Sequence, residues 1–315
     1  MAKPVAVLCA DLHLNHEPPG RRVVSDWYDE MGRVLGVIRE LVNVNHCVIC
    51  AGDVFHRWKS YPQLVNWAID HLPVPFYSIP GQHDLPYHQL DELEKSAYCT
   101  LVKAGVVDDL GSSYKVVDSN GVKLLLCGFP WGSDLVVSSE LRDVLENFDG
   151  LKLAVVHKYL WYGNACYDGV TEDSHVERFK DFFGNFDVAV IGDNHAPFDL
   201  KLDNGCVVWN CGCLLKRSLA ERNYPVRVGV LMSDGSVYQE EIDKGVDYEW
   251  MLDGVNGEDE DDSADDVRLG DFMKELSELE LNKIDFVSVI NRLVENKEVD
   301  DRVAKEIFDA LEECI

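Results

Sequence analysis

Residues 4–13 read PVAVLCADLH, an apolar run that ends directly in Asp11 and His13. A short apolar run bounded by polar residues is typical of a buried strand. Similar runs recur along the chain, and amphipathic stretches with helical spacing separate the early ones. This alternation predicts an α/β fold. The predicted strands are Val5–Ala10, Cys47–Ala51, Phe76–Ile79, Lys123–Gly128, Lys152–Val156, Val188–Ile191 and Cys206–Asn210.

The connections between these strands change in kind along the chain. Apolar residues repeat at helical spacing from Trp27 to Val42, which predicts a long helix packed on a sheet. Later connections contain Ser119-Asn-Gly121, Asp203-Asn-Gly205 and Ser233-Asp-Gly235. An Asn-Gly or Asp-Gly pair between β-rich runs predicts a hairpin. We therefore expect residues 1–245 to form two stacked mixed β-sheets flanked by helices, in place of one parallel sheet.

The C-terminal part of the chain differs in composition from the rest. From Val246 onward it contains 23 acidic and 7 basic residues. Residues 253–266 have almost no apolar side chains to bury, so residues 246–266 are expected to form an acidic linker. Three amphipathic stripes follow and predict a small helical module over residues 267–315. The stripes alone do not decide whether this module caps the main domain or docks on a partner.

Composition limits the location and the partners of the protein. No stretch approaches the roughly 18 consecutive apolar residues of a membrane span, and the ten cysteines lie mostly in apolar segments without paired spacing, which favours the reduced cytoplasm. Cys47 and Cys50 form a C-x-x-C inside a predicted strand, which favours buried thiols over a redox or zinc site. The net charge of −28 repels phosphate backbones, so nucleic-acid binding requires a partner, a basic strip or bound cations.

Five clusters of polar residues directly follow predicted strands. Their carboxylate, imidazole and amide side chains are ligands for a divalent cation such as Mn, Fe or Zn. Each cluster alone has a simple explanation, such as a turn or a hydrogen-bonded histidine. Five in succession at strand ends indicate a metal site at the edge of a sheet. The clusters are Asp11-Leu-His13, Gly52-Asp53, Gly81-Gln-His-Asp84, His157 and Gly192-Asp-Asn-His195.

The order of these clusters resembles that of the calcineurin-like metallophosphoesterases, which carry D-x-H, G-D, G-N-H-D, H and G-H-x-H after successive strands. The resemblance extends over about residues 5–243 and includes Asn210-Cys-Gly-Cys-Leu, which is similar to the family's N-P-G-S segment. It implies a four-layer metallophosphoesterase fold with a two-metal site. On the matching positions, it implies that Asp11, His13 and His195 hold one ion, that Gln82, His157 and Asp193 hold the other, and that Asp53 bridges them.

The same resemblance implies two further roles. His83 is expected above the metals as a catalytic residue that stabilises developing charge or protonates the leaving oxygen, and Asp84 is expected to orient its ring. The chain departs from the family pattern where Gln82 replaces Asn and Asp193 replaces His. The extra carboxylate favours hard cations. The expected cofactors are therefore two divalent ions, with Mn in first place and Mg, Fe or Zn as alternatives.

Within the family, Asp11-Leu-His-Leu14, Ala51-Gly-Asp-Val-Phe55 and Ser78-Ile-Pro-Gly-Gln-His-Asp84 are most similar to SbcD-type DNA-repair exonucleases. That similarity implies a DNA nuclease subunit that works with an SMC-like ATPase bound through the helical tail, with a homodimer as a further arrangement. Two alternatives stay open. The acidity of the catalytic domain favours a small phosphoester or a phosphoprotein as substrate, and the substituted Gln82 and Asp193 favour a metal-poor scaffold without activity.

Residues that would contact a substrate are harder to find in this sequence. Basic residues near the clusters are candidates for phosphate contact, and ring side chains that follow the clusters are candidates for stacking on bases. For the basic residues, ordinary surface charge is the favoured explanation, whereas for the rings core or rim packing is an equally good one. The basic set is Arg21, Arg22, Arg57, Lys59, Lys158, Lys216 and Arg217, and the ring set is His16, Tyr61, Tyr159 and Trp161.

Overall fold

The computed structural model describes residues 2–42, 46–167, 170–244, 246 and 248–251. These residues belong to the first of the two units into which the chain divides, Met1–Gly254. The predicted helical module over 267–315 and most of the predicted linker over 246–266 lie outside the described residues. In the described part, no helix has both the length and the apolar character needed to cross a membrane.

The first sheet has six strands in the order β13-β12-β1-β3-β4-β5. β1 pairs in parallel with β3 and antiparallel with β12, so the sheet is mixed. Its parallel pairs are connected by the helices α1 (Trp27–Leu41), α2 (Pro62–His71) and α3 (Ala97–Lys103). The strands are β1 (Pro4–Cys9), β3 (Cys47–Cys50), β4 (Phe76–Ser78), β5 (Val107–Asp109), β12 (Arg227–Met232) and β13 (Val237–Glu241).

The second sheet has six strands in the order β10-β11-β9-β8-β7-β6, with α4 (Ser139–Asn147) and α5 (Lys180–Phe183) in the connections on either side of β8. The pairs β6–β7, β10–β11 and, in the first sheet, β12–β13 are antiparallel hairpins, which confirms the three predicted turns. The strands are β6 (Tyr114–Ser119), β7 (Val122–Phe129), β8 (Leu151–His157), β9 (Val188–Gly192), β10 (Phe198–Lys201) and β11 (Val207–Asn210).

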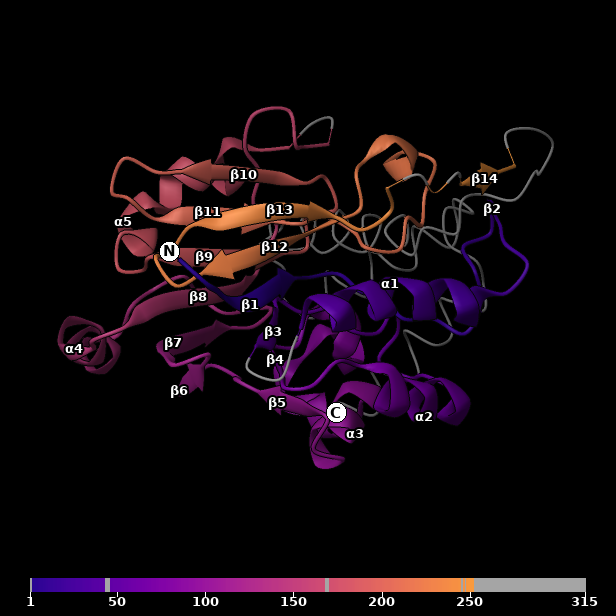
Figure 1. The fold of residues 1–315 in the computed structure, drawn as a ribbon, viewed down its shortest axis with the longest axis horizontal. Helices are drawn as coiled ribbons and strands as arrows, with labels where there is room; N and C mark the ends of the chain where they lie inside the picture. The colour runs from indigo at the N-terminus through magenta and orange to yellow at the C-terminus, as the bar shows by residue number, and fades with distance from the viewer. Residues whose placement is uncertain (1, 43–45, 168–169, 245, 247, 252–315) are drawn as a thin grey trace, which may run out of the picture. The chain divides into compact units, whose positions relative to one another are not determined.

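Alternate residues of the second sheet belong to two different cores. Leu153 and Val155 of β8 join the cluster that contains the first sheet, whereas Ala154 and Val156 join a second cluster with helix α5. Helices α1, α2 and α3 lie on one side of the sheets, and α4 and α5 lie on the other (Figure 1). Burial of both faces of each sheet supplies the main driving force for this layering. The predicted pair of stacked mixed sheets flanked by helices is confirmed.

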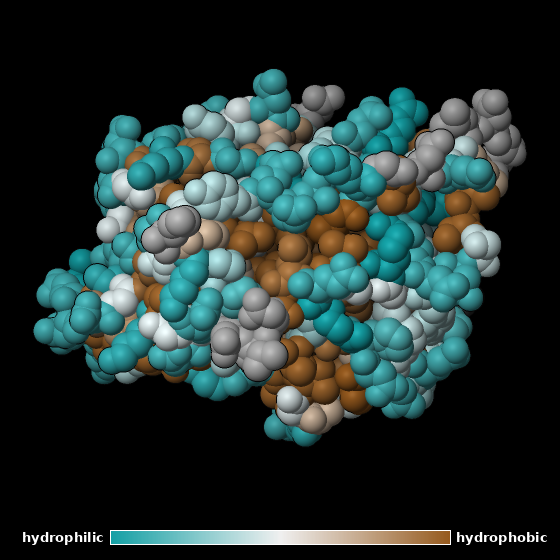
Figure 2. All heavy atoms as spheres, in the orientation of Figure 1, coloured by the Kyte–Doolittle hydropathy of each residue, from teal (hydrophilic) through white to brown (hydrophobic). Residues whose placement is uncertain are grey.

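Polar contacts add to this packing at selected points. The Asp26 carboxylate accepts hydrogen bonds from the backbone amides of Tyr28 and Asp29 and so caps α1. Cys47 and Cys50 are buried within β3, as their position in a predicted strand suggested. Hydrophilic residues border most of the face drawn in Figure 2, and hydrophobic residues gather at its centre and near its lower edge.

A short two-stranded sheet holds the last described residues. β14 (Glu249–Trp250) pairs antiparallel with β2 (Arg22–Val23). The Arg22 guanidinium is buried here, 4.4 Å and 5.2 Å from the ring centres of Tyr248 and Trp250. Contacts of this kind are stabilising when the cation is desolvated. The chain therefore stays attached to the first unit as far as Trp250, several residues into the predicted linker.

Candidate metal centre

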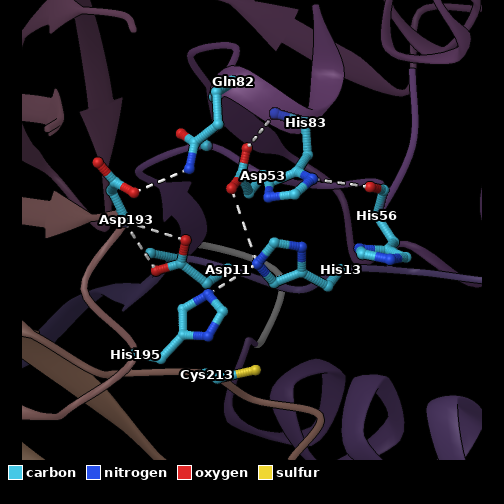
Figure 3. A network of polar contacts seen from close by, with 12 residues as sticks. Asp11, His13, Asp53, His56, Gln82, His83, Asp193, His195 and Cys213 are labelled. Atoms are coloured by element: carbon cyan, nitrogen blue, oxygen red, sulfur yellow. Dashed lines mark hydrogen bonds and ion pairs between the residues drawn. The ribbon is translucent and has the colours of Figure 1, made fainter. Parts of the chain in front are cut away.

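The predicted ligands come together where strands of the two sheets end (Figure 3). Asp11, His13, Asp53 and Asp193 follow β1, β3 and β9, and all four have positive φ, between 45° and 84°. This conformation is uncommon for residues other than glycine, and strain of this kind concentrates at functional sites. It turns the chain sharply at the strand end, so that these side chains are grouped at one edge.

Three of the predicted ligands form one compact group. Potential ligand atoms of Asp11, His13 and His195 lie within 4.8 Å of one another. The Nε2 atoms of His13 and His195 are 2.9 Å apart. On the far side of its ring, His195 Nδ1 lies 2.7 Å from a carboxylate oxygen of Glu221. A carboxylate in that position fixes the ring and its tautomer, with Nε2 directed at the group.

Asp53 occupies the middle of the site. Its side chain is fully buried, and its Oδ1 accepts a hydrogen bond of 3.0 Å from the His83 backbone amide. Its Oδ2 lies 3.7 Å from His13 Nε2 and 3.5 Å from His157 Nε2. Within the described residues this oxygen has no hydrogen-bond partner. A buried anionic oxygen without a partner is costly unless a cation compensates it.

The other predicted ligands are held by one amide. The Oε1 of Gln82 lies 2.6 Å from His157 Nε2, and its Nε2 donates a hydrogen bond of 2.8 Å to Asp193 Oδ1. The second carboxylate oxygen of Asp193 is buried, and it too lacks a hydrogen-bond partner in the described part of the chain. On its far side, the His157 ring contacts the Ala51 carbonyl through Nδ1. The side chain of Gln82, which is one methylene longer than the Asn of the family pattern, thus reaches both His157 and Asp193.

The pKa values of these groups reflect burial and crowding of charge. Burial raises the pKa of Asp11 to about 7, and burial also raises the pKa of Asp193. Burial would raise the pKa of Asp53 as well, but the charges of His157 and His83 outweigh it and lower that pKa to about 2. Burial, together with His195, lowers the pKa of His13, which favours a neutral imidazole. The charges of nearby carboxylates outweigh burial at His157 and His195 and raise the pKa values of both rings, so a cation would displace their protons. Carboxylates, imidazoles and orphaned oxygens are the donor set of divalent cations.

Asp84 has a different role from the one expected. Its carboxylate accepts hydrogen bonds from three backbone amides, those of Val54, Phe55 and Gly81, at 2.9–3.1 Å. It therefore ties the loop after β3 to the loop after β4. Gly81 is required at this junction because a Cβ atom there would overlap the Asp53 carboxylate.

The ring of His83 takes a backbone partner instead of Asp84. Its Nδ1 lies 2.9 Å from the carbonyl oxygen of His56, which corrects the expected pairing. The three-residue turn η1 (Gln82–Asp84) directs the Asp84 carboxylate toward backbone amides, so the adjacent residues do not pair. The other nitrogen of the His83 ring is on the side of Asp53 and His13 (Figure 3).

Two residues near the centre, His56 and Glu221, were missed in the sequence, and a third, Cys213, was noted only as part of the Asn210-Cys-Gly-Cys-Leu segment. His56 forms a possible ligand group with His13 and His83, and Cys213 and Glu221 form another with His195. His56 follows Asp53 by three residues, and its place directly after Gly-Asp-Val-Phe is a signal that would have found it. Glu221 lies far from the other clusters in the sequence, and its spacing carries no such signal.

The candidates for substrate contact differ in their burial and in their distance from the site. Lys216 is buried in an ion pair with Asp243 at 3.3 Å, so, like Arg22, it has a structural role. Arg217 lies beside the site, with its guanidinium 2.6 Å from His56 Nε2. Trp161 donates a hydrogen bond from its indole to the Thr171 carbonyl. By contrast, 65% of Tyr61 is exposed.

Comparison with known proteins finds a curated relative by sequence. Over 227 residues the chain is 29% identical to the DNA double-strand break repair protein Mre11 of Haloferax volcanii, a match that covers 68% of this chain and 46% of the relative. The chain thus spans about half the length of that curated relative.

Solved structures superpose on part of the chain at low sequence identity. The 5'-nucleotidase of Candida albicans superposes with a TM-score of 0.50 at 11% identity, covering 77% of this chain and 54% of that chain. The NAD nucleotidase of Haemophilus influenzae gives a TM-score of 0.45 at 14% identity and covers 76% of this chain and 49% of that chain. Residues 5–197, more than half of the chain, match the calcineurin-like phosphoesterase family. The resemblance seen in the sequence is confirmed, and the chain belongs to the calcineurin-like phosphoesterase family, a class of metal-dependent phosphoesterases.

Proposed function

We propose that this chain is a two-metal-dependent phosphodiesterase. In this proposal Asp11, His13 and His195 hold one ion, Gln82, His157 and Asp193 hold the other, and Asp53 contacts both. The observation that carries it is the buried Oδ2 of Asp53, which lacks a hydrogen-bond partner among the described residues and lies between His13 and His157. Bound there, divalent cations such as Mn supply an activated water and neutralise the phosphoryl oxygens.

Backbone and side-chain contacts prepare these ligands. The Ala51 carbonyl and the Glu221 carboxylate hold the Nδ1 sides of His157 and His195, which leaves each Nε2 for the centre. The His83 amide fixes one oxygen of Asp53, so that the other oxygen faces the two imidazoles. Each ligand is thus oriented before a cation arrives.

His83 is the catalytic residue in this proposal. The His56 carbonyl accepts the Nδ1 proton of its ring, which leaves Nε2 on the side of the centre. When the ring also carries a proton on Nε2, it can give that proton to the leaving oxygen of a phosphodiester. Asp84 acts at a distance from the chemistry, by holding the two loops that carry Asp53 and His83.

We further propose that the substrate is DNA and that the chain is a nuclease subunit of SbcD type. The relative in Haloferax volcanii, named a DNA double-strand break repair protein, supports this substrate. An SMC-like ATPase partner bound through residues 267–315, a homodimer and a cytoplasmic location complete the proposal. These features rest on the sequence alone.

Hydrolysis of bis-p-nitrophenyl phosphate and of labelled DNA, each with Mn, Mg, Zn or EDTA, tests the proposal. We expect hydrolysis of both substrates with Mn and none with EDTA. His83→Ala should lose hydrolysis and still bind two equivalents of Mn in calorimetry, whereas His71→Ala, a histidine stacked on Trp67, should behave as the wild type. Full activity of His83→Ala would remove His83 from the mechanism, and absence of Mn binding would leave only a scaffold.

One observation favours a second candidate, an enzyme for small phosphoesters or phosphoproteins. The net charge of −28 repels long polyanions, and two of the expected basic contacts, Arg22 and Lys216, are buried in structural interactions. Hydrolysis of the small diester with Mn but of no DNA substrate would favour this candidate over the nuclease.

A further inference from the structure

A row of rings leads away from the candidate metal centre. Trp131, in the loop after β7, lies with its ring centre 6.4 Å from that of His157, a proposed ligand. The ring of His88 follows at 6.3 Å from Trp131. Tyr87 is next to His88 in sequence, and its ring is 5.9 Å from that of Trp58. We call Trp58, Tyr87, His88 and Trp131 the aromatic row.

The rings of the aromatic row are not stacked face to face on one another. Neighbouring planes in the aromatic row are inclined by 48° to 83°, in contrast to Trp67 and His71 on α2, which stack at 11° with centres 4.3 Å apart. Tyr87 is 73% exposed. A large ring left in water at a fixed position forgoes the free energy that its burial would provide.

The backbone at Tyr87 is strained as well. Tyr87 and His88 have φ of 52° and 56°, so two successive residues other than glycine adopt the left-handed conformation. Such a conformation costs on the order of 1 kcal/mol for each residue and persists where surrounding structure enforces it. In this conformation the exposed Tyr87 ring lies beside Trp58, and the adjacent His88 ring contacts Trp131.

Beyond Trp58 the row reaches a cavity with basic residues. This cavity has a volume of about 300 Å³, and Trp58, Lys59, Ser60, Lys95 and Thr100 contribute to its lining. Lys59 and Lys95 are exposed, and Lys95 pairs with Glu92 on the surface. Flat ring faces followed by two ammonium groups and two hydroxyl groups are suited to a molecule with planar groups and phosphates.

We propose that the aromatic row binds the unpaired bases of a single-stranded nucleic acid whose backbone passes the metal centre. This inference rests on the proposed nuclease function and names its substrate as an unpaired strand. Only unpaired bases can offer their faces to side-chain rings, because a duplex stacks them on each other. Stacking also needs no net positive charge, so it suits a protein of charge −28. Lys59 and Lys95 then contact the backbone phosphates.

Fluorescence anisotropy in EDTA, where no cleavage occurs, tests this proposal on the full chain. The probes are labelled oligothymidine of about 12 nucleotides, a length within the range of known single-strand sites, and a duplex of the same length. Tyr87→Phe keeps a ring and should bind the single strand as the wild type does. Tyr87→Leu keeps the bulk without the ring and should bind about 5- to 100-fold more weakly, as expected for one lost stacked base. Trp131→Ala should show a similar loss.

Tyr238→Ala is the matched control, because Tyr238 is a 59% exposed tyrosine on β13, at the opposite edge of the first sheet from β5. It should bind as the wild type does. Two contacting lysines predict a shallow salt dependence, with a slope of log K against log salt of about −1.4. Equal binding of Tyr87→Leu and Tyr87→Phe, or a duplex bound as tightly as the single strand, would overturn the proposal.

The two proposals fail in different ways. Wild-type hydrolysis of bis-p-nitrophenyl phosphate with Mn, together with no binding of the single strand, would overturn the proposal that the aromatic row binds bases. It would leave the phosphodiesterase proposal unaffected. Binding of the single strand through Tyr87 without any hydrolysis would overturn the phosphodiesterase and support the aromatic row as a binding site.

Discussion

Replacement of Asp84 should destabilise the protein strongly, and by an amount that depends on the replacement. The Asp84 carboxylate is fully buried and accepts three backbone hydrogen bonds, two at Oδ2 from Val54 and Gly81 and one at Oδ1 from Phe55. A buried donor that loses its acceptor costs about 1–3 kcal/mol. Asp84→Ala leaves three such donors, so we expect it to lower the free energy of unfolding by about 3–6 kcal/mol, even with some relaxation.

Asp84→Asn retains one oxygen acceptor. If the amide oxygen takes the place of Oδ2, only the Phe55 amide loses its partner and faces an NH₂ group, at a cost of about 1–3 kcal/mol. Both variants remove the same negative charge near Asp53. The difference between them therefore reports the hydrogen bonds and is independent of the charge. Stabilities of whole domains are typically about 5–15 kcal/mol, so the alanine variant should be near its folding limit.

Urea unfolding in EDTA, followed by tryptophan fluorescence, measures these differences through the shift in midpoint. Asp118→Asn is the control, because Asp118 is exposed and accepts one backbone hydrogen bond, from Gly121. It should change the stability by no more than about 0.5 kcal/mol. Equal stabilities of Asp84→Asn and Asp84→Ala, or losses below about 1 kcal/mol in both, would refute the assignment of Asp84 as the residue that joins the two loops.

Three further predictions follow from the site. Glu221→Gln should weaken Mn binding in calorimetry by about 10- to 100-fold, because the carboxylate holds the His195 ring; unchanged affinity would contradict this. In the metal-free protein, Glu221 has a pKa lowered to about 2 from 4.5, and His195 a pKa raised to about 9 from 6.5; burial opposes both shifts, and the mutual charge and hydrogen bond of the pair outweigh it. The stability that the pair contributes should be greatest between pH 4.5 and 6.5. It should decline as pH rises through 9, where His195 loses its proton, and as pH falls toward 2, where Glu221 gains one. In Glu221→Gln, the pH profile of thermal unfolding should lack this maximum. Gly81→Ala should abolish hydrolysis and lower the urea midpoint, whereas Gly36→Ala, in open space on α1, should raise the stability by up to about 1 kcal/mol.

The sequence was sufficient to find the residues that come together at the candidate metal centre, because each belongs to a local pattern. Asp11, Asp53 and Asp193 follow apolar runs directly, and the structure places them at the ends of β1, β3 and β9. The hairpin turns could be predicted equally well, because two or three adjacent residues determine the type of a turn. The stacking of the sheets could be predicted from the change between helical connections and hairpins.

Other features depend on contacts between distant segments and could not be predicted in this way. Arg22 has the sequence context of a surface cation, but Tyr248 and Trp250 come from more than 200 residues away to bury it. Glu221 reaches His195 only because of the course of the chain after β11. Asp84 is adjacent to His83, and the family resemblance implied a contact between them that the geometry of a tight turn prevents. Neighbourhood in sequence indicates a contact only when the local backbone directs both side chains the same way.

The acidity of the protein and its candidate metal centre together determine where a phosphodiester is attracted. Buried Asp11 and Asp53, with the buried Oδ2 of Asp193, create a strong local demand for cations, while the net charge of −28 removes long-range attraction for a polyanion. A phosphodiester therefore gains favourable electrostatics only close to bound metals and the few basic residues at the end of the aromatic row. Stacking on Tyr87 and Trp131 acts over the same short range and is insensitive to net charge. On this basis, binding selects strands whose bases are already unpaired near the centre, and added salt should change the preference for single strands far less than loss of the Tyr87 ring does.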